Sequence, residues 1–288
     1  MIHSYFHIHS EHSYDAKLPL EEIAKGAMAC GFTRVGITDH LNYNDPPFLQ
    51  NIYDSAAGVK ALREKYPFMF LGVELTPIQK AQFDYIAKNG TREGYALPKG
   101  ADRYGIELAL TKQELMALGI RYAVGAAHWS IDTIGTEEAH GFEGTLREFY
   151  RQQMWLAEDE RVTILGHPWY NGHGFWGEDL SVIPRSMQME LAAAVKENGK
   201  YVECNSGMLF NKYTGEKYRY QYAEMLREYF EMGIRVTYGS DSHRSYNNDR
   251  ILEEQPLAGR AHEAMAKYLA AAGFKDGDFY TLQDSDLW

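Results

Sequence analysis

Short apolar segments alternate along the chain with longer segments in which apolar residues recur at helical spacing. This alternation is typical of βαβ units, in which a helix connects two parallel strands. The segments with strand character are 5–9, 34–38, 68–74, 121–127, 162–167, 201–205 and 235–239. Such repeated units predict either an open doubly wound sheet or a barrel, and both folds bind ligands at the carboxyl ends of their strands.

Between these strands, helical spacing predicts a series of helices. Several of them end at a glycine that suits a left-handed cap, as at Gly31 and Gly199. The predicted helices are 20–30, 55–65, 111–118, 146–158, 183–198, 218–232 and 260–272. Residues 76–110 are predicted as a long polar insertion, and loops of that length commonly carry function. No linker or repeat divides the chain, so we expect residues 1–288 to form a single domain.

Histidine and acidic residues stand at the carboxyl ends of six of the seven predicted strands. His7 and His9 end the first strand, and because strand side chains alternate, both imidazoles point to the same face. The others are Asp39 with His40, Glu74, His128, His167, and Asp241 with His243. Imidazole together with carboxylate is the ligand set of Zn, Fe or Mn, whereas Mg and Ca take mostly oxygen ligands. Each motif alone is a weak signal, but their shared position indicates a metal centre.

Composition and charge exclude several other classes of protein. A hydrophobic fraction of 45% is enough to bury a large core, which excludes extensive disorder. The net charge of −11, without any Lys/Arg-rich block, argues against binding to a nucleic-acid backbone or to an anionic membrane. Cys30 and Cys204 lack the spacing of a disulfide framework or a zinc ribbon. With no signal-peptide pattern and no apolar run of roughly 18 residues, we expect a cytoplasmic protein.

The ligand-type residues occur in the order His7-x-His9-Ser-x-x-Ser13-x-Asp15, Thr38-Asp39-His40, Glu74, His128, Gly166-His167-Pro168 and Ser240-Asp241-x-His243. This order resembles that of the PHP (polymerase and histidinol phosphatase) superfamily, and the resemblance extends from residue 7 to residue 243. It implies a distorted, seven-stranded, TIM-like (β/α)7 barrel. It also implies a centre of two or three divalent metal ions, of Zn, Fe or Mn in preference to Mg.

The resemblance also implies how the ligands are shared among the ions. A first ion would be held by His7, His9, Glu74 and Asp241. Glu74 would bridge to a second ion held by His128 and His167. A third ion would be held by Asp15, His40 and His243.

Such a centre suits hydrolysis of a phosphate monoester, with a metal-bound hydroxide attacking phosphorus. Asp241 or His243 could protonate the leaving group, and Arg244 is the best-placed cation to contact the phosphate. Weaker candidates for substrate contacts are Lys99, Arg103, His12 and His173, and an aromatic wall could come from Trp169, Tyr170 and Trp176. Cys204 is expected to be a buried apolar residue.

Among proteins that the chain resembles, stand-alone histidinol-phosphatases suit its length and motif order. We therefore expect histidinol phosphate as substrate and a role in histidine biosynthesis. Other PHP phosphoesterases act on nucleotides or phosphotyrosine, and this alternative stays open. A C–N hydrolase of the amidohydrolase type would commonly need a lysine at the fourth strand, where this chain has His128. A non-catalytic PHP module is the third alternative, but the complete ligand set argues against it.

Overall fold

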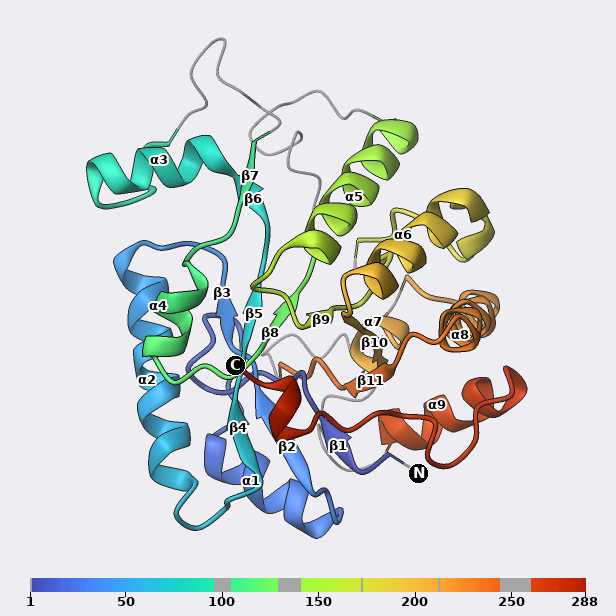
Figure 1. Ribbon diagram of the computed structural model, residues 1–288, viewed down its shortest axis with the longest axis horizontal. Helices are drawn as coiled ribbons and strands as arrows, with labels where there is room; N and C mark the ends of the chain where they lie inside the picture. Colours follow the sequence, from blue (N-terminus) through green and yellow to red (C-terminus); the bar gives the residue numbers. More distant parts are fainter. Residues whose placement is uncertain (1, 96–104, 129–140, 172, 212, 244–259) are drawn as a thin grey trace.

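The computed structural model describes residues 2–95, 105–128, 141–171, 173–211, 213–243 and 260–288. Parallel strands occupy its centre, and helices surround them (Figure 1). The central strands are β1 Ser4–Tyr5, β2 Arg34–Ile37, β3 His40–Leu41, β4 Met69–Leu71, β5 Val73–Leu75, β8 Ala123–Gly125, β9 Ile164–Leu165, β10 Tyr201–Asn205 and β11 Val236–Gly239. Each predicted strand overlaps a strand of the structure, and the third is divided into β4 and β5. The first is shorter than predicted, because β1 ends at Tyr5 and does not include His7 and His9. The second, β2, is followed by a separate short strand, β3.

The strands form two parallel ladders, β1-β2-β4 and β11-β10-β9-β8-β5-β3. Because β2 continues into β3 and β4 into β5, the two ladders follow one another around a ring. In the described residues the ring is not closed by a regular ladder between β1 and β11. Backbone hydrogen bonds bridge this gap, from Phe6 N to Tyr238 O at 3.0 Å and from Ser240 N to His7 O at 3.1 Å. The predicted barrel with distorted pairing is therefore confirmed.

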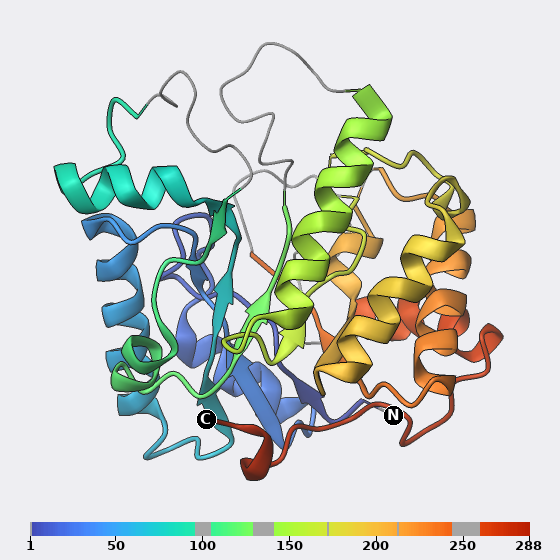
Figure 2. The ribbon, with the colours of Figure 1, turned by 45° about the horizontal axis from the view of Figure 1, so that its top comes forward.

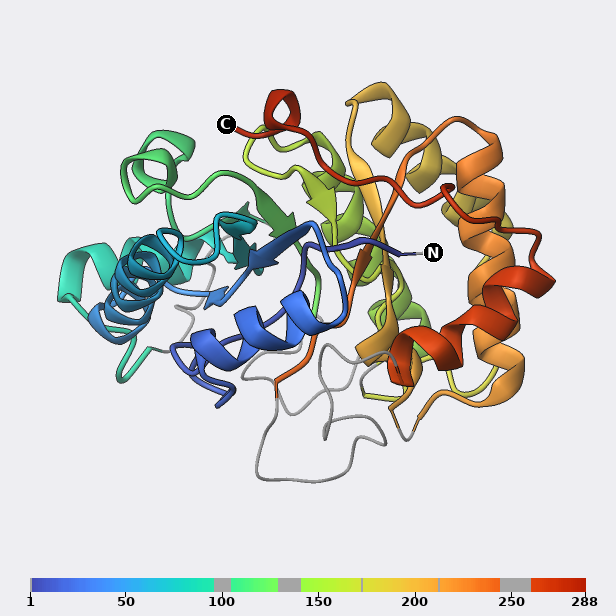
Figure 3. The same cartoon turned by 90° about the horizontal axis from the view of Figure 1, so that it is seen from below.

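The helices cover the outside of the strands, as the view from below shows (Figure 3). They are α1 Leu20–Ala29, α2 Pro46–Leu62, α3 Lys80–Asn89, α4 Lys112–Ala117, α5 Gly141–Glu158, α6 Arg185–Glu197, α7 Ser206–Leu209, α8 Glu216–Glu231 and α9 Arg260–Ala271. In α1, Leu20, Ile23, Ala24 and Ala27 are buried. This spacing places them on one helical face, which packs toward the strands.

Four helices differ from the prediction. The helix α5 begins at Gly141 rather than at residue 146, and the short helix α7 lies where no helix is predicted. α2 begins at Pro46 rather than at residue 55, because proline is tolerated in a first helical turn. Within 76–110, where no helix is predicted, α3 buries Phe83 and Ile86 and ends at Gly90, whose φ is +76°. α3 follows the short strand β6 Ile78–Gln79, which pairs antiparallel with β7 Ile106–Glu107. The insertion is therefore partly regular structure, and α3 projects at the upper left of Figure 2.

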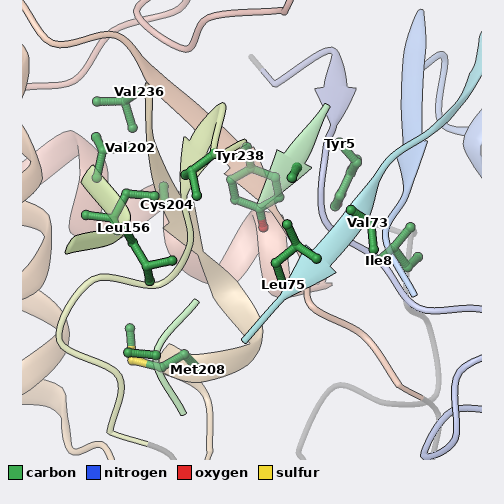
Figure 4. Packing of buried hydrophobic residues seen from close by; sticks show 14 of the residues in the cluster. Tyr5, Ile8, Val73, Leu75, Leu156, Val202, Cys204, Met208, Val236 and Tyr238 are labelled. Atoms are coloured by element: carbon green, nitrogen blue, oxygen red, sulfur yellow. The ribbon is translucent and has the colours of Figure 1, made fainter. Parts of the chain in front are cut away.

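The buried apolar residues form two clusters. The larger cluster lies between the strands and the helices, and Figure 4 shows part of it, including Tyr5, Val73 and Val236. The smaller cluster consists of Phe6, Phe70, Tyr122, Val124, Ile164, Tyr201 and Leu282. Ile164 and Tyr201 begin their strands, so this second cluster fills the amino end of the barrel. The carboxyl end is left for the polar residues.

Candidate metal centre

All the predicted ligands meet at the carboxyl end of the barrel. His7 and His9 follow β1, His40 begins β3, and Glu74 lies in β5, where it is paired in register with His40. The remaining ligands come from the loops after β8, β9 and β11 and from the loop before α1: His128, His167, Asp241, His243 and Asp15. Parallel strands present their carboxyl ends together, so residues far apart in the chain converge here.

Glu74 is fully buried at the middle of this cluster. Its Oε2 atom lies near nitrogens of His7 (3.2 Å), His9 (3.2 Å) and His40 (2.9 Å). Its Oε1 atom lies near the Nε2 atoms of His128 (3.2 Å) and His167 (3.1 Å). The two oxygens of one carboxylate therefore face two different sets of imidazoles, which is the arrangement of a carboxylate that could bridge two cations.

His7, His9, Glu74 and Asp241 form a compact group of four buried donors. The Nε2 atoms of His7 and His9 are 3.2 Å apart, and Asp241 Oδ1 is 3.2 Å from His9 Nε2. Ligand nitrogens bind zinc at 2.0–2.1 Å, which separates two nitrogens on a tetrahedral ion by about 3.3 Å. The spacing in this group therefore fits a shared cation.

A second pair of facing imidazoles lies beside the first. His40 Nε2 is 3.2 Å from His243 Nε2, and both nitrogens are 3.4 Å from Asp15 Oδ2. The ring of His9 stacks on both imidazoles, at centroid distances of 4.3 and 4.0 Å. The sets of possible ligands therefore share residues. His9 belongs to a set with His40 and His243 and also to the set with His7. His40 also groups with Glu74 and His128.

Hydrogen bonds to the outer nitrogens set the tautomers of three ligands. His7 Nδ1 is 2.8 Å from Glu203 Oε1, and since a carboxylate only accepts, Nδ1 carries the proton. His243 Nδ1 donates to the backbone oxygen of Asp241 at 3.0 Å. Each of these bonds directs an Nε2 atom into the cluster, which is the usual arrangement around a metal-binding histidine.

The third such bond is made by His128. Its Nδ1 atom is 3.1 Å from Thr76 Oγ1, and that hydroxyl donates to Asn42 Oδ1 at 2.7 Å. Because the hydroxyl proton is used toward Asn42, Thr76 accepts from His128 Nδ1. The Nε2 atom of His128, which lies 3.2 Å from Glu74 Oε1, is then directed into the cluster.

Glu203 is a buried residue of the centre that was not among the predicted catalytic or metal-binding residues. Besides contacting His7, it accepts hydrogen bonds through Oε2 from His167 N (2.8 Å) and Asn205 Nδ2 (3.1 Å). Space for this carboxylate exists because residue 239 is glycine, where a Cβ would collide with Glu203 Oε1. A lone carboxylate within the apolar strand 201–205 was the available signal, because glutamate is rarely buried without a partner.

The charges of the cluster are strongly coupled. Burial opposes a charge on His7, but the carboxylates of Glu203, Glu74 and Asp241 outweigh it and raise the pKa of the imidazole well above its usual value. Burial is likewise outweighed at His40, where Glu74 and Asp15 raise the pKa to about 10. Burial dominates at His128 and lowers its pKa to about 4. The protons on His7 and His40 occupy positions where a cation could neutralise the carboxylates instead.

The pKa values of the carboxyl groups shift in the opposite direction, downward. Burial would raise the pKa of Glu74, but the charges of His40, His7 and His128 lower it well below its usual value. Burial is also outweighed at Asp241, chiefly by His7, so its pKa is well below the usual range. Both carboxyl groups are therefore ionised and available as ligands.

Three residues near the centre have left-handed backbone conformations that are unusual without glycine. They are His167 (φ +24°), Trp169 (φ +59°) and Asp241 (φ +48°). Such conformations cost free energy and occur preferentially at functional sites. Here they turn the chain sharply after β9 and β11, which brings His167 and Asp241 into the cluster.

The residues predicted to contact the substrate differ in how far they are buried. Trp169 and Trp176 are buried, and Trp176 Nε1 donates to Trp169 O at 3.0 Å, so these two rings pack beneath the rim. Tyr170 remains half-buried beside the ligands, with its ring centroid 4.8 Å from that of His167. His173 is exposed, while Cys204 is fully buried as expected. Arg244, Lys99 and Arg103 lie outside the described residues.

None of the helices in the described parts of the chain combines the length and apolar character needed to cross a membrane.

Comparison with known proteins shows the family to which the chain belongs. A family model described as PHP domain matches residues 6–280. A probable histidinol-phosphatase of Thermotoga maritima is 25% identical over 249 residues, which are 86% of this chain and 87% of that protein. The crystal structure of histidinol phosphate phosphatase from Lactococcus lactis, complexed with zinc, L-histidinol and phosphate, superposes with a TM-score of 0.59 at 16% identity and 94% coverage of both chains. This structural likeness supports the barrel fold.

Proposed function

Since the chain belongs to the PHP domain family, we propose that it is a metal-dependent phosphoesterase that hydrolyses a small phosphate monoester, histidinol phosphate. The Thermotoga maritima relative, a probable histidinol-phosphatase, supports this choice of substrate. The observation that carries the reaction class is Glu74, whose two oxygens lie among different sets of imidazole nitrogens. Centres that hold adjacent divalent ions catalyse displacement at phosphorus.

We assign the donors to the sets that membership of the family implies, of which the first also forms a compact group in the structure. His7, His9, Asp241 and Glu74 Oε2 would hold one ion, and Glu74 Oε1, His128 and His167 a second. Asp15, His40 and His243 would hold a third. The mixed nitrogen and oxygen donors favour Zn, Fe or Mn over Mg. When bound, such ions supply Lewis acidity to the phosphoryl group and lower the pKa of water.

The protein's own contribution is to hold the donors ready. Three histidines, His7, His128 and His243, donate hydrogen bonds through Nδ1 to Glu203, Thr76 and the backbone oxygen of Asp241, respectively. Their Nε2 atoms therefore face the centre before any ligand binds. This arrangement removes the cost of reorienting them. The low pKa of the Asp241 carboxyl suits it to binding a cation and leaves protonation of the leaving oxygen to another group.

Phosphate release from a panel of esters tests the proposal. The protein is freed of metal with a chelator and reconstituted separately with Zn, Mn, Fe(II) and Mg. The panel contains histidinol phosphate, nucleoside monophosphates, sugar phosphates and phosphotyrosine. We expect the highest kcat/KM for histidinol phosphate, and no turnover by the chelated protein. A preference for another ester would retain the phosphoesterase and replace its substrate, whereas no phosphate release despite bound metal would contradict the proposal.

A matched pair of variants links that activity to the centre. His9→Ala removes a donor that is fully buried, and we expect it to abolish turnover. His3→Ala removes an exposed imidazole that precedes the same strand, β1, at the opposite end of the barrel. We expect His3→Ala to retain full activity. Equal activity of the two variants would show that the cluster is not the reaction centre.

A further inference from the structure

The proposed ligands are unequally accessible, and this indicates the side from which a substrate enters. The side chains of Glu74 and His9 are 0% exposed. Asp15 is 32% exposed and His128 is 13% exposed. Among the described ligands, these two are the most accessible. A phosphoryl group would therefore reach the centre beside Asp15 and His128, with its ester oxygen directed outward.

Two tyrosines flank that side of the centre. Tyr14 directly precedes Asp15, and its ring centroid is 5.3 Å from that of His40. Tyr170 lies beside a different ligand, with its ring centroid 5.5 Å from that of His128. Tyr14 is 54% exposed although it adjoins the ligands, whereas Tyr170 is half-buried. An exposed aromatic ring is unremarkable by itself, but Tyr14 stands beside the opening of the proposed site.

The ring of Tyr14 also packs against an aromatic ring of α2. Its centroid is 5.3 Å from that of Phe48, a buried residue of α2. The guanidinium of Arg92 lies over Phe48 at 4.8 Å and over Tyr43 at 4.4 Å, and its Nε is 3.6 Å from Asp45 Oδ2. Arg92 belongs to the insertion 76–110. Through Arg92 and Phe48, the insertion therefore supports an aromatic surface at the site.

From this placement we propose that Tyr14 contacts the leaving group of the substrate and makes the site selective for phosphate monoesters whose organic part carries a flat aromatic or heteroaromatic ring. The inference rests on the proposed function, because that function places the phosphoryl group among the ligands. Favourable contact between two aromatic rings corresponds to roughly 3- to 10-fold in affinity. The imidazole of histidinol phosphate meets this requirement, and so does the phenyl ring of a synthetic ester.

Binding of unreactive phosphonates tests the contact without requiring turnover. The zinc-loaded full chain is titrated calorimetrically with 3-phenylpropylphosphonate and with propylphosphonate. We expect the phenyl compound to bind roughly 3- to 10-fold more tightly. Tyr14→Ala should bring the two dissociation constants close together, and Tyr14→Phe should keep them apart because it retains the ring. Tyr53→Ala, at a tyrosine of α2 that is 47% exposed, is the control and should change neither constant.

Hydrolysis provides the second measurement. 2-Phenylethyl phosphate and propyl phosphate release alcohols of similar basicity, so their ratio of kcat/KM reports recognition of the ring. Tyr14→Ala should lower this ratio roughly 3- to 10-fold. An unchanged ratio, equal binding of the two phosphonates by the parent protein, or binding of neither would overturn the assignment. Ring-selective binding that depends on Tyr14 but is accompanied by no phosphate release would instead contradict the proposed hydrolysis.

Discussion

The two ends of the barrel bury opposite kinds of side chains. At the carboxyl end, imidazoles and carboxylates surround Glu74, which is fully buried. At the amino end, the buried groups are mostly aromatic, and Tyr122 donates a hydrogen bond to Phe6 O at 3.0 Å. Burying apolar rings stabilises a fold, whereas burying ionisable groups costs free energy unless they are paired. The amino end is thus built for stability and the carboxyl end for binding.

Both ends create room for a large buried group by placing glycine opposite it. A Cβ at Gly36 would collide with the hydroxyl of Tyr122, and a Cβ at Gly239 would collide with the carboxylate of Glu203. At the amino end the space is filled by a ring that packs. At the carboxyl end it is filled by a carboxylate that orients His7. The same backbone device therefore serves packing at one end and ligand orientation at the other.

The amino end is also covered by the last residues of the chain, which pass from α9 toward β8 (Figure 3). Leu282 is buried in the aromatic cluster, and Tyr201 donates to Asp286 Oδ1 at 2.7 Å. Trp288 and Arg121 are joined by two hydrogen bonds, of 2.7 and 3.0 Å. If the two ends have separate roles, variants at one end should change stability and variants at the other should change metal binding and activity.

The largest effect is expected for Glu74→Gln at the carboxyl end. The amide has the same size but removes the charge that both sets of imidazoles share. Loss of metal would remove several kcal/mol of transition-state stabilisation, so we expect kcat/KM to fall by at least about a thousandfold. Elemental analysis and phosphate release measure the outcome, with Glu197→Gln at an exposed position of α6 as control. Unchanged metal content would refute the central role of Glu74.

The next largest effect is expected at the amino end. Tyr122→Ala leaves a cavity where a fully buried ring stood, and we expect the free energy of unfolding to fall by about 3–5 kcal/mol. Tyr122→Phe removes only the hydrogen bond to Phe6 O and should cost about 1 kcal/mol. Urea denaturation measures both. Metal content of the folded variants should equal that of the parent protein, and a lower content would show that the two ends are not independent.

Glu203→Gln, at the carboxyl end, should have an intermediate effect on metal affinity. Glutamine fits the space but is a weaker acceptor for the Nδ1 proton of His7, so the imidazole is less firmly oriented. Changes to such supporting residues typically cost about 10- to 100-fold in metal affinity or activity. Competition with a chelator measures the affinity, and the urea midpoint serves as control for folding. Parent-like affinity would show that Glu203 fills space without orienting His7.

Metal affinity should also depend on pH. In the metal-free protein, His40 has a pKa raised to about 10 and His7 is shifted in the same direction, so both imidazoles are protonated near neutrality. A cation must displace these protons, so affinity should rise with pH, by about tenfold per unit for each proton released, between about pH 6 and about pH 9. His128, with a pKa of about 4, should release none. Affinity that is constant over this range would contradict the displacement.

Much of the centre could be predicted from the sequence because its parts are local. His7 and His9 stand two residues apart directly after β1, and Glu74, His128 and His167 each follow or end an apolar segment. Parallel strands in a barrel necessarily gather their carboxyl ends, so the strand count and the ligand positions together predicted the cluster. The left-handed caps at Gly31 and Gly199 likewise located helix ends.

Other features depended on contacts that no local pattern records. Glu203 acts on His7 across nearly two hundred residues of chain, and Tyr122 fills a space left by Gly36 in a different strand. The start of α2 was missed because apolar spacing is weak near Pro46, and α3 because the polarity of 76–110 concealed the pair Phe83 and Ile86.

The sequence by itself determined the alternation of strands and helices, the residue types at the strand ends and hence the nitrogen and oxygen donors available for metals. These properties follow from periodicity and side-chain chemistry, which act over a few residues. Only the tertiary structure decided that Glu74 faces two sets of imidazoles, that Glu203 orients His7, and that Tyr14 stands beside the accessible ligands. The reason is physical: orientation and exposure depend on packing between segments distant in the chain, and that packing exists only once the barrel has formed.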